Sequence, residues 1–215
     1  MPIVTWNMQG ASHSTENKWN LGVLNLLNYN DLCCLQECGG IPGSAVSSTQ
    51  SYNNIPGLGL YTWGGSSSRG QKYILFYPAD PNGNRCNLAI VSKVAPTAGF
   101  LFLPAVNPWR PTIGMTVAGT VFFTLHAISP NGVDAPALVN GAFGAAGAQV
   151  IVAGDYNRNY GTMGGGSQVV CPPNAATHPA INPVSYYDYA IKNFGAATVG
   201  TVLNLYLSDH LPVQF

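Results

Sequence analysis

The stretch Gln149-Val150-Ile151-Val152-Ala153, followed by Gly154-Asp155-Tyr156-Asn157, decides the fold. Its first part is a short, mainly apolar run with β-branched side chains, and Gly154 closes it, so the pattern predicts a buried strand. In layered α/β folds, ligands bind at the carboxyl edge of such strands. Asp155 and Asn157 therefore form either part of a functional site or an Asx-type turn, and this stretch alone leaves both alternatives open.

The composition indicates a compact, strand-rich domain with many loops. The 215 residues suffice for one large domain, residues 1–215, and the sequence contains no repeat of fixed period and no linker. Hydrophobic residues make up 47% of the chain, a globular value, whereas charged residues make up only 7%, far below the usual level of about a quarter. Glycine and proline are abundant without a period, which excludes a collagen-like chain.

The charge of the chain limits how it can bind other molecules. Its formal net charge is zero, with eight Lys and Arg residues in total. Proteins that hold nucleic acid by bulk electrostatics usually carry a basic excess. Nucleic-acid binding by this chain must therefore rest on a few placed cations, with the help of a metal ion. The low charge also fits a chain that works with partner subunits.

The number and spacing of the cysteines and the hydropathy of the chain indicate where in or outside the cell the protein is located. The five cysteines include no Cys-x-x-Cys pair, and no histidine cluster has the spacing of a zinc site. Cys33 and Cys34 point to opposite faces of a predicted strand, so we expect small core residues. One disulfide is an alternative, and the odd count leaves the redox compartment open. Met1-Pro2-Ile3-Val4 enters a strand directly, and no apolar run is long enough for a membrane span. We expect an intracellular chain or a mature form whose leader has been removed.

Hydrophobic periodicity and turn residues predict the remaining elements. We expect strands at 2–6, 31–37, 71–77, 87–93, 100–103, 112–117, 121–127, 149–153, 186–192 and 211–215, helices at 17–28 and 134–148, and loops at 39–68 and 160–185. The strand–helix–strand order at the start predicts a parallel pair with a right-handed crossover, which places Asn7 beside Glu37. The strands at 71–77 and 87–93 should form an antiparallel hairpin.

The scarce acidic residues gather at positions where a solvated role is not expected. Half of the eight acids, and two histidines, lie at strand ends or inside strands: Glu37, Asp155, Asp188, Asp209, His126 and His210. Carboxylate and amide oxygens suit a hard cation such as Mg²⁺, and histidines beside them suit proton transfer and oxyanion stabilisation. Singly, each histidine could be structural and Asp209 a cap or turn residue. Together they predict metal-assisted hydrolysis of a phosphate ester.

Six short motifs in chain order carry a family resemblance. They are Thr5-Trp6-Asn7, Leu35-Gln36-Glu37, Thr124-Leu125-His126, Gly154-Asp155-Tyr156-Asn157, Tyr187-Asp188-Tyr189 and Ser208-Asp209-His210. In this respect the chain resembles the endonuclease/exonuclease/phosphatase (DNase I-like) superfamily. Further stretches, at 6–12, 15–20, 87–92, 110–111 and 134–139, are similar to the catalytic component of cytolethal distending toxins, so that the resemblance runs from residue 4 to 213.

The resemblance implies a fold and a metal site. The fold would be a four-layer α/β sandwich, in which two packed mixed sheets are flanked by helices. Glu37 would hold Mg²⁺, with Mn²⁺ or Ca²⁺ as alternatives, and Asn7 and Asp209 would help.

The resemblance also implies roles for the other polar residues. His210, paired to Asp188, would be the general base or a phosphate stabiliser. Asp155 and Asn157 would orient or activate the attacking water, and His126 would contact the scissile phosphate or protonate the leaving oxygen. The expected contacts to substrate phosphate are Arg85, Arg110 and Arg158.

The implied activity is that of a DNA-nicking endonuclease, the catalytic subunit of a cytolethal distending-type toxin. Alternatives are a phosphoinositide phosphatase that uses the same site and an inactive fold that acts as a binding module. DNA or a phosphoinositide head group and toxin delivery subunits would be the partners. The resemblance further implies a secreted subunit that acts inside a target cell, with the nucleus as one destination. The chain departs from typical toxin subunits in being shorter and less charged, with a diverged Gly-rich segment after Asn157.

Overall fold

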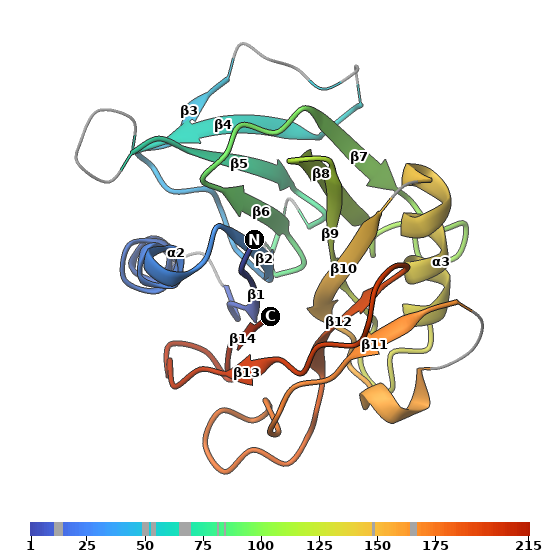
Figure 1. Ribbon diagram of the computed structural model, residues 1–215. Coiled ribbons are helices and arrows are strands. Elements are labelled where there is room, and N and C mark those ends of the chain that lie inside the picture. The colour runs from blue at the N-terminus through green and yellow to red at the C-terminus, as the bar shows by residue number, and fades with distance from the viewer. Residues whose placement is uncertain are drawn as a thin grey trace.

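Two mixed β-sheets pack face to face in the computed structural model, which describes residues 1–10, 15–48, 52, 55–64, 70–80, 82–83, 85–147, 149–163 and 167–215 (Figure 1). In the first sheet the strand order is β13-β14-β1-β2-β6-β5-β4-β3. Its strands are β1 (Ile3–Asn7), β2 (Leu32–Gln36), β3 (Val46–Ser47), β4 (Gly59–Trp63), β5 (Lys72–Tyr77), β6 (Leu88–Ser92), β13 (Thr201–Val202) and β14 (Val213–Gln214).

The second sheet has the strand order β11-β12-β10-β9-β8-β7. Its strands are β7 (Ala98–Phe102), β8 (Thr112–Val117), β9 (Thr120–His126), β10 (Val150–Asp155), β11 (Val169–Cys171) and β12 (Asp188–Lys192). The helical segments are α1 (Thr15–Asn17), the π-helical η1 (Lys18–Val23), α2 (Leu24–Tyr29), α3 (Ala135–Ala146) and the 3₁₀ turn η2 (Tyr160–Thr162).

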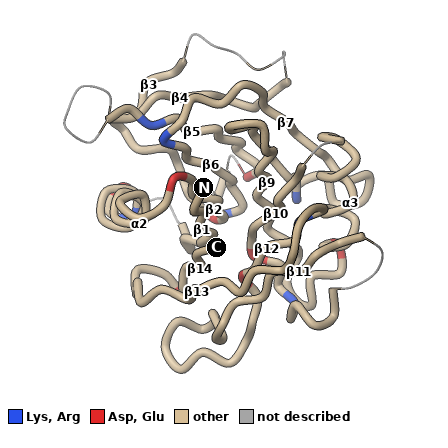
Figure 2. The backbone as a smooth tube through the Cα atoms, in the orientation of Figure 1, with Lys and Arg blue, Asp and Glu red and all other residues tan. Residues whose placement is uncertain are grey.

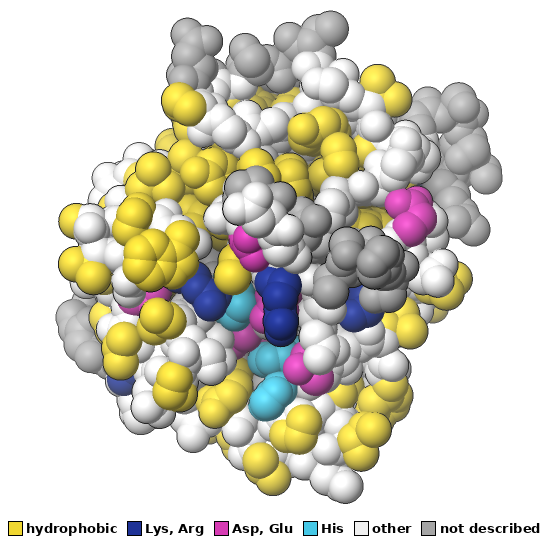
Figure 3. Space-filling model, turned by 180° about the vertical axis from the view of Figure 1, so that it is seen from behind, with side chains coloured by type: hydrophobic (Ala, Val, Ile, Leu, Met, Phe, Trp, Pro, Cys, Tyr) yellow, Lys and Arg dark blue, Asp and Glu magenta, His cyan; other side chains and the backbone are white. Residues whose placement is uncertain are grey.

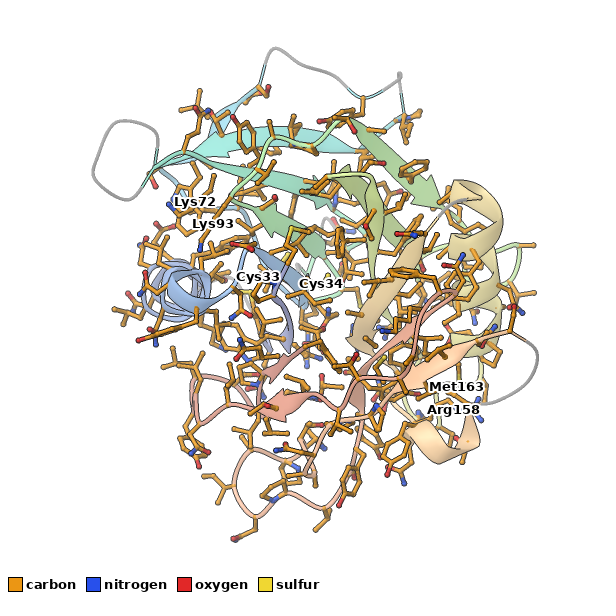
Figure 4. All side chains as sticks on the ribbon, in the orientation of Figure 1. Cys33, Cys34, Lys72, Lys93, Arg158 and Met163 are labelled. Carbon is orange, nitrogen blue, oxygen red and sulfur yellow. The ribbon has the colours of Figure 1, made fainter. Side chains whose placement is uncertain are left out.

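Three hydrophobic clusters separate four layers. One lies between the sheets, the second lies between the first sheet and the α1–α2 helical segment, and the third lies between the second sheet and α3 (Figure 1). Cys33 belongs to the outer cluster of the first sheet and Cys34 to the cluster between the sheets, because successive strand residues face opposite sides (Figure 4). The predicted four-layer α/β sandwich and the core positions of both cysteines are confirmed.

Strand pairing brings polar residues from distant parts of the chain into two neighbouring rows. β1 and β2 are parallel, with Asn7 opposite Gln36, so Glu37 follows directly beside Asn7 as predicted. In the second sheet, Asp155 of β10 pairs with His126 of β9 on one side and with Asp188 of β12 on the other. The predicted antiparallel pairing of the strands near 71–77 and 87–93 is also confirmed, as β5 and β6.

Two predicted loops contain regular structure. The range 39–68 holds β3 and β4, and the range 160–185 holds η2 and β11. β4 has Gly at its first position and only two buried side chains, so its apolar pattern is weak, and β3 and β11 are short edge strands. The predicted helix at 17–28 exists as α1, η1 and α2, and its central turn is π-helical. All five cysteines are free thiols in this structure.

The packing of β9 against β10 explains the glycine at position 154. A Cβ atom at Gly154 would lie 2.2 Å from the carbonyl oxygen of Leu125, whereas one at Gly144 in α3 would meet nothing within 4 Å. We expect Gly154→Ala to lower the free energy of unfolding by about 1–3 kcal/mol, because the strands must separate. Gly144→Ala should raise it by about 0.5–1 kcal/mol, because alanine favours a helix. Urea unfolding of both variants tests this, and equal stabilities would contradict it.

Candidate functional site

A cleft of about 560 Å³ opens where the ends of β2, β9 and β10 meet the start of β12. Histidine, acidic and basic side chains gather in this hollow near the centre of one face (Figure 3), although charged residues are sparse along the chain as a whole (Figure 2). The lining residues are Glu37, Asp80, Arg85, Cys86, Arg110, His126, Ser129, Asp155, Asn157, His178, Tyr187, Asp209 and His210.

Asn7 joins the two sheets beneath the cleft. Its side-chain Nδ2 donates to Oδ2 of Asp155 at 2.9 Å and to Oε1 of Glu37 at 3.3 Å. Its Oδ1 accepts the backbone N–H of Gln9 at 2.9 Å. One buried amide therefore holds a carboxylate of each sheet, and its own oxygen is fixed by the following loop.

The backbone at the strand ends is strained in the way functional sites often are. Gln9, Glu37 and Asn157 have φ values of 46°, 45° and 49°, in the left-handed region that side-chain-bearing residues rarely adopt. Asn157 is held there because its N–H donates to Oδ1 of Asp155 at 2.8 Å and its Nδ2 donates to the carbonyl of Ala127 at 2.9 Å. These contacts hold Asn157 in the wall of the cleft.

His210 and Asp188 form a buried ion pair. Nδ1 of His210 lies 2.8 Å from Oδ2 of Asp188, which is fully buried. Burial alone would lower the pKa of His210, but the carboxylates of Asp188 and Asp155 outweigh it and raise this pKa to about 10. His210 is therefore a cation at neutral pH, with Nδ1–H directed at Asp188 and Nε2 placed 3.7 Å from Oδ2 of Asp155.

Asp155 is the buried carboxylate at the centre of the site. Burial raises its pKa to about 7, and the nearby Asp188 carboxylate acts in the same direction, against the opposing effects of His210 and Asn7. Such a carboxyl group exchanges its proton near neutral pH, which is the property a general base needs.

His126 lies on the other side of Asp155. Its Nδ1 lies 2.9 Å from a guanidinium nitrogen of Arg110, which can only donate, so Nδ1 is the acceptor. Burial and the positive charges of Arg110 and His210 hold the pKa of His126 well below its usual range. Neutral His126 therefore carries its proton on Nε2, which lies 3.6 Å from Glu37 Oε1 and 3.5 Å from Asp155 Oδ2.

The oxygen atoms of the cleft fit a divalent cation. Burial raises the pKa of Glu37, and the like charge of Asp209 raises it further, against the hydrogen bond from Asn7. A hard cation such as Mg²⁺ takes carboxylate oxygens and would relieve this repulsion. Asp155, Asp188 and His210 also bring three ligand atoms within 4.8 Å of one another. The acidic and histidine groups of this cleft can thus hold a metal ion.

Most of the residues predicted from the sequence meet at this cleft. The structure brings together Asn7, Glu37, His126, Asp155, Asn157, Asp188, Asp209 and His210, with Arg85 and Arg110 on its walls. Arg158 does not line it. The Arg158 guanidinium donates to the backbone and hydroxyl oxygens of Thr162, each at 3.0 Å, beside η2 (Figure 4).

His178, which lines the cleft, and Lys18, which lies beside it, are among the residues that were not predicted from the sequence. His178 lies in a predicted loop, with its ring 4.4 Å from that of His210. Lys18 is nearly buried and donates to the carbonyls of Met8 and Gln9, which supports the loop after β1. The rarity of their residue types could have drawn attention to both residues, because the chain has only four histidines and eight Lys and Arg residues.

The sequence and the fold are similar to those of known proteins. A model of the Endonuclease/Exonuclease/phosphatase family matches residues 4–210. The chain is 38% identical over 146 residues to a Salmonella typhi homolog of the cytolethal distending toxin B-subunit, and 40% identical over 144 residues to the Escherichia coli B-subunit of that toxin. These matches cover 64% of this chain and 54% and 53% of the two relatives. The chain thus spans about half the length of the curated relatives it matches.

A solved structure is similar over the whole chain. The crystal structure of cytolethal distending toxin from Actinobacillus actinomycetemcomitans matches with a TM-score of 0.88 and 29% identity, covering 100% of this chain and 97% of that chain. The predicted resemblance and the DNase I-like fold class are confirmed by these matches. In the described part of this chain, no helix combines the length and hydropathy needed to cross a bilayer.

The raised pKa of His210 can be tested through its partner. Asp188→Asn removes the facing negative charge, so we expect the pKa of His210 to fall from about 10 by roughly 2 units. Asp209→Asn is the matched control, because the Asp209 carboxylate is 39% exposed and acts less strongly on His210. NMR titration of the imidazole resonances measures both variants. A larger shift in Asp209→Asn than in Asp188→Asn would contradict the assignment.

Proposed function

The chain belongs to the endonuclease/exonuclease/phosphatase family, and on that basis we propose that it is a divalent-metal-dependent phosphodiesterase that nicks DNA. We further propose that it is the catalytic subunit of a cytolethal distending-type toxin, which acts inside a target cell with the help of delivery subunits. The observation that carries the proposal is the position of Asp155. This carboxyl group, with a pKa of about 7, pairs with neutral His126 on the adjacent strand β9 and lies 3.7 Å from Nε2 of cationic His210.

In the proposed chemistry, different residues of the cleft bind the metal ion, accept the proton of the water and orient these groups. Glu37 and Asp209, with Asn7 orienting Glu37, would hold Mg²⁺ or a similar ion, which polarises the phosphate and neutralises its growing charge when bound. Asp155 accepts the proton of the attacking water, and Asn157 fixes the Asp155 carboxylate through its N–H at 2.8 Å. The alternative role of His210 as general base fits less well, because its high pKa keeps it protonated.

The two histidines then act on the phosphate rather than on the water. Cationic His210 stabilises negative charge on the phosphate oxygens, and Asp188 fixes its ring and its charge. Neutral His126 donates its Nε2–H to a phosphate oxygen, because its Nδ1 is engaged by Arg110. This pairing favours phosphate contact over protonation of the leaving oxygen.

Substrate binding is proposed to rest on two arginines. Arg85 and Arg110 belong to the lining of the cleft, and a guanidinium binds phosphate through paired hydrogen bonds. Arg110 is already held at His126, so it would place the phosphate against that ring. The expected contact from Arg158 requires its bonds to Thr162 to break first, and we propose a lesser role for it.

The phosphoinositide phosphatase remains the second candidate, and the charge of the chain favours it. A net charge of zero offers little long-range attraction to a long polyanion, whereas the cleft itself accepts any phosphate ester. The third alternative, an inactive binding module, fits poorly with strained, buried and charged residues that converge on one cleft.

Supercoiled plasmid with Mg²⁺ tests the proposed activity. We expect the wild-type chain to nick the plasmid, and His126→Ala, His210→Ala and Asp155→Asn to reduce the rate by a factor on the order of 10²–10⁴, because each removes a phosphate or proton contact. Asp31→Asn is the matched control for Asp155→Asn, since Asp31 pairs with Lys93 at the surface. It should retain the full rate.

The same preparations decide among the candidate functions. An intact plasmid together with phosphate release from a 3,4,5-phosphorylated inositol lipid would replace the nuclease with the phosphatase. No hydrolysis of either substrate, with Mg²⁺ or Mn²⁺, would contradict both and leave the binding module.

A further inference from the structure

His178, Asp209 and His210 form a second group of metal-ligating atoms at the mouth of the cleft. One ligand atom of each lies within 4.8 Å of the other two. Nε2 of His178 is 3.9 Å from Oδ2 of Asp209, and the two imidazole rings are 4.4 Å apart. His178 has no role in the chemistry proposed above. The group is invisible in the sequence, because His178 stands far from Asp209 and His210 along the chain.

Both imidazoles are held by neighbours in orientations suited to ligation. Nδ1 of His210 is bound to the Asp188 carboxylate at 2.8 Å, so Nε2 is the nitrogen left for a ligand. Metal-ligating histidines typically bind a carboxylate through their other nitrogen in this way. His178 stacks on Tyr187, with 5.6 Å between ring centroids and an interplanar angle of 23°. One nitrogen of each imidazole and one oxygen of the partly exposed Asp209 carboxylate thus lie within 4.8 Å of one another.

The ligand atoms of this group favour a different class of metal ion than the carboxylate oxygens elsewhere in the cleft do. Two imidazole nitrogens and one carboxylate are the ligands of Zn²⁺ in hydrolytic zinc sites, with water in the fourth position. Mg²⁺ prefers oxygen ligands and an octahedral shell, and borderline metals prefer imidazole. We propose that His178, Asp209 and His210 form an inhibitory site for Zn²⁺ or a similar borderline transition-metal ion.

The consequence for the cleft is competition for shared residues. A Zn²⁺ ion there displaces the Nε2 proton of His210 to solvent and takes the Asp209 carboxylate. It thereby withdraws the cation that faces the phosphate and one proposed Mg²⁺ ligand at the same time. Binding of the ion does not depend on the proposed function, whereas inhibition does rest on it.

Direct metal binding by the metal-free chain of 215 residues tests the site. We expect titration calorimetry to show a Zn²⁺ site that His178→Gln weakens by at least about tenfold, the scale on which metal affinity responds to loss of supporting contacts. Cys86→Ser is the control, because Cys86 is the thiol that lines this cleft, and it should leave the affinity unchanged. Co²⁺ bound in place of Zn²⁺ should give tetrahedral ligand-field bands without a thiolate charge-transfer band.

Unchanged affinity in His178→Gln, or loss of the site in Cys86→Ser, would overturn the proposal. Inhibition is measured separately, as the Zn²⁺ concentration that halves Mg²⁺-supported plasmid nicking, relative to the zinc-free rate of each variant. This concentration should rise in His178→Gln by the same factor as the dissociation constant. Binding without inhibition would overturn the inhibitory role. A chain that binds Zn²⁺ but never nicks plasmid would instead count against the proposed function and leave the binding site standing.

Discussion

Buried side-chain hydrogen bonds join the two sheets beneath the cleft, where Nε2 of Gln36 in β2 donates to Oγ1 of Thr124 in β9 at 2.7 Å and Asn7 makes the bond on which the cleft depends. Nδ2 of Asn7, at the end of β1 in the first sheet, donates to Oδ2 of Asp155, at the end of β10 in the second, at 2.9 Å. The same nitrogen holds Glu37. The packing of two sheets over an apolar layer fixes their separation but leaves their sliding loosely defined, since hydrophobic contact is non-directional. A buried, directional bond adds the register that brings both sets of polar strand ends to one cleft.

Burial of these polar groups lowers the stability of the fold by an amount that depends on pH. The pKa of Asp155 is raised to about 7, above its value in an unfolded chain, so its ionisation as pH rises through neutrality costs the fold stability. The pKa of His210 is raised to about 10, so the stability it contributes is present at low and neutral pH and is lost as pH rises through that value. The cation offsets its carboxylate neighbours, and a strained, charged cleft persists at neutral pH.

The sequence was sufficient for the architecture and for most of the cleft. Runs with strong strand propensity such as Val121–His126 and Val150–Asp155 were recognisable, and the histidine and the acid at their ends were conspicuous because the chain has so few of either. Short or glycine-containing strands such as β3 and β4 were not recognisable, because their stability comes from pairing and not from local pattern. His178 was missed for a similar reason, since a loop carries no periodicity and only the folded chain places its ring against His210. Arg158 is held by local bonds to Thr162 and by a tertiary bond to the carbonyl oxygen of Gly132 at 3.4 Å, and no sequence pattern indicates either contact.

The central claim is that buried Asp155 is the proton acceptor, and the pH dependence of kcat/KM for phosphodiester hydrolysis tests it most directly. At saturating Mg²⁺, the account predicts that kcat/KM rises with pH and levels off above about pH 7, the pKa of Asp155. In Asp155→Asn, the residual activity should lack this rise while His210 remains protonated. If the same acidic limb persists in Asp155→Asn, another group accepts the proton and the account is wrong.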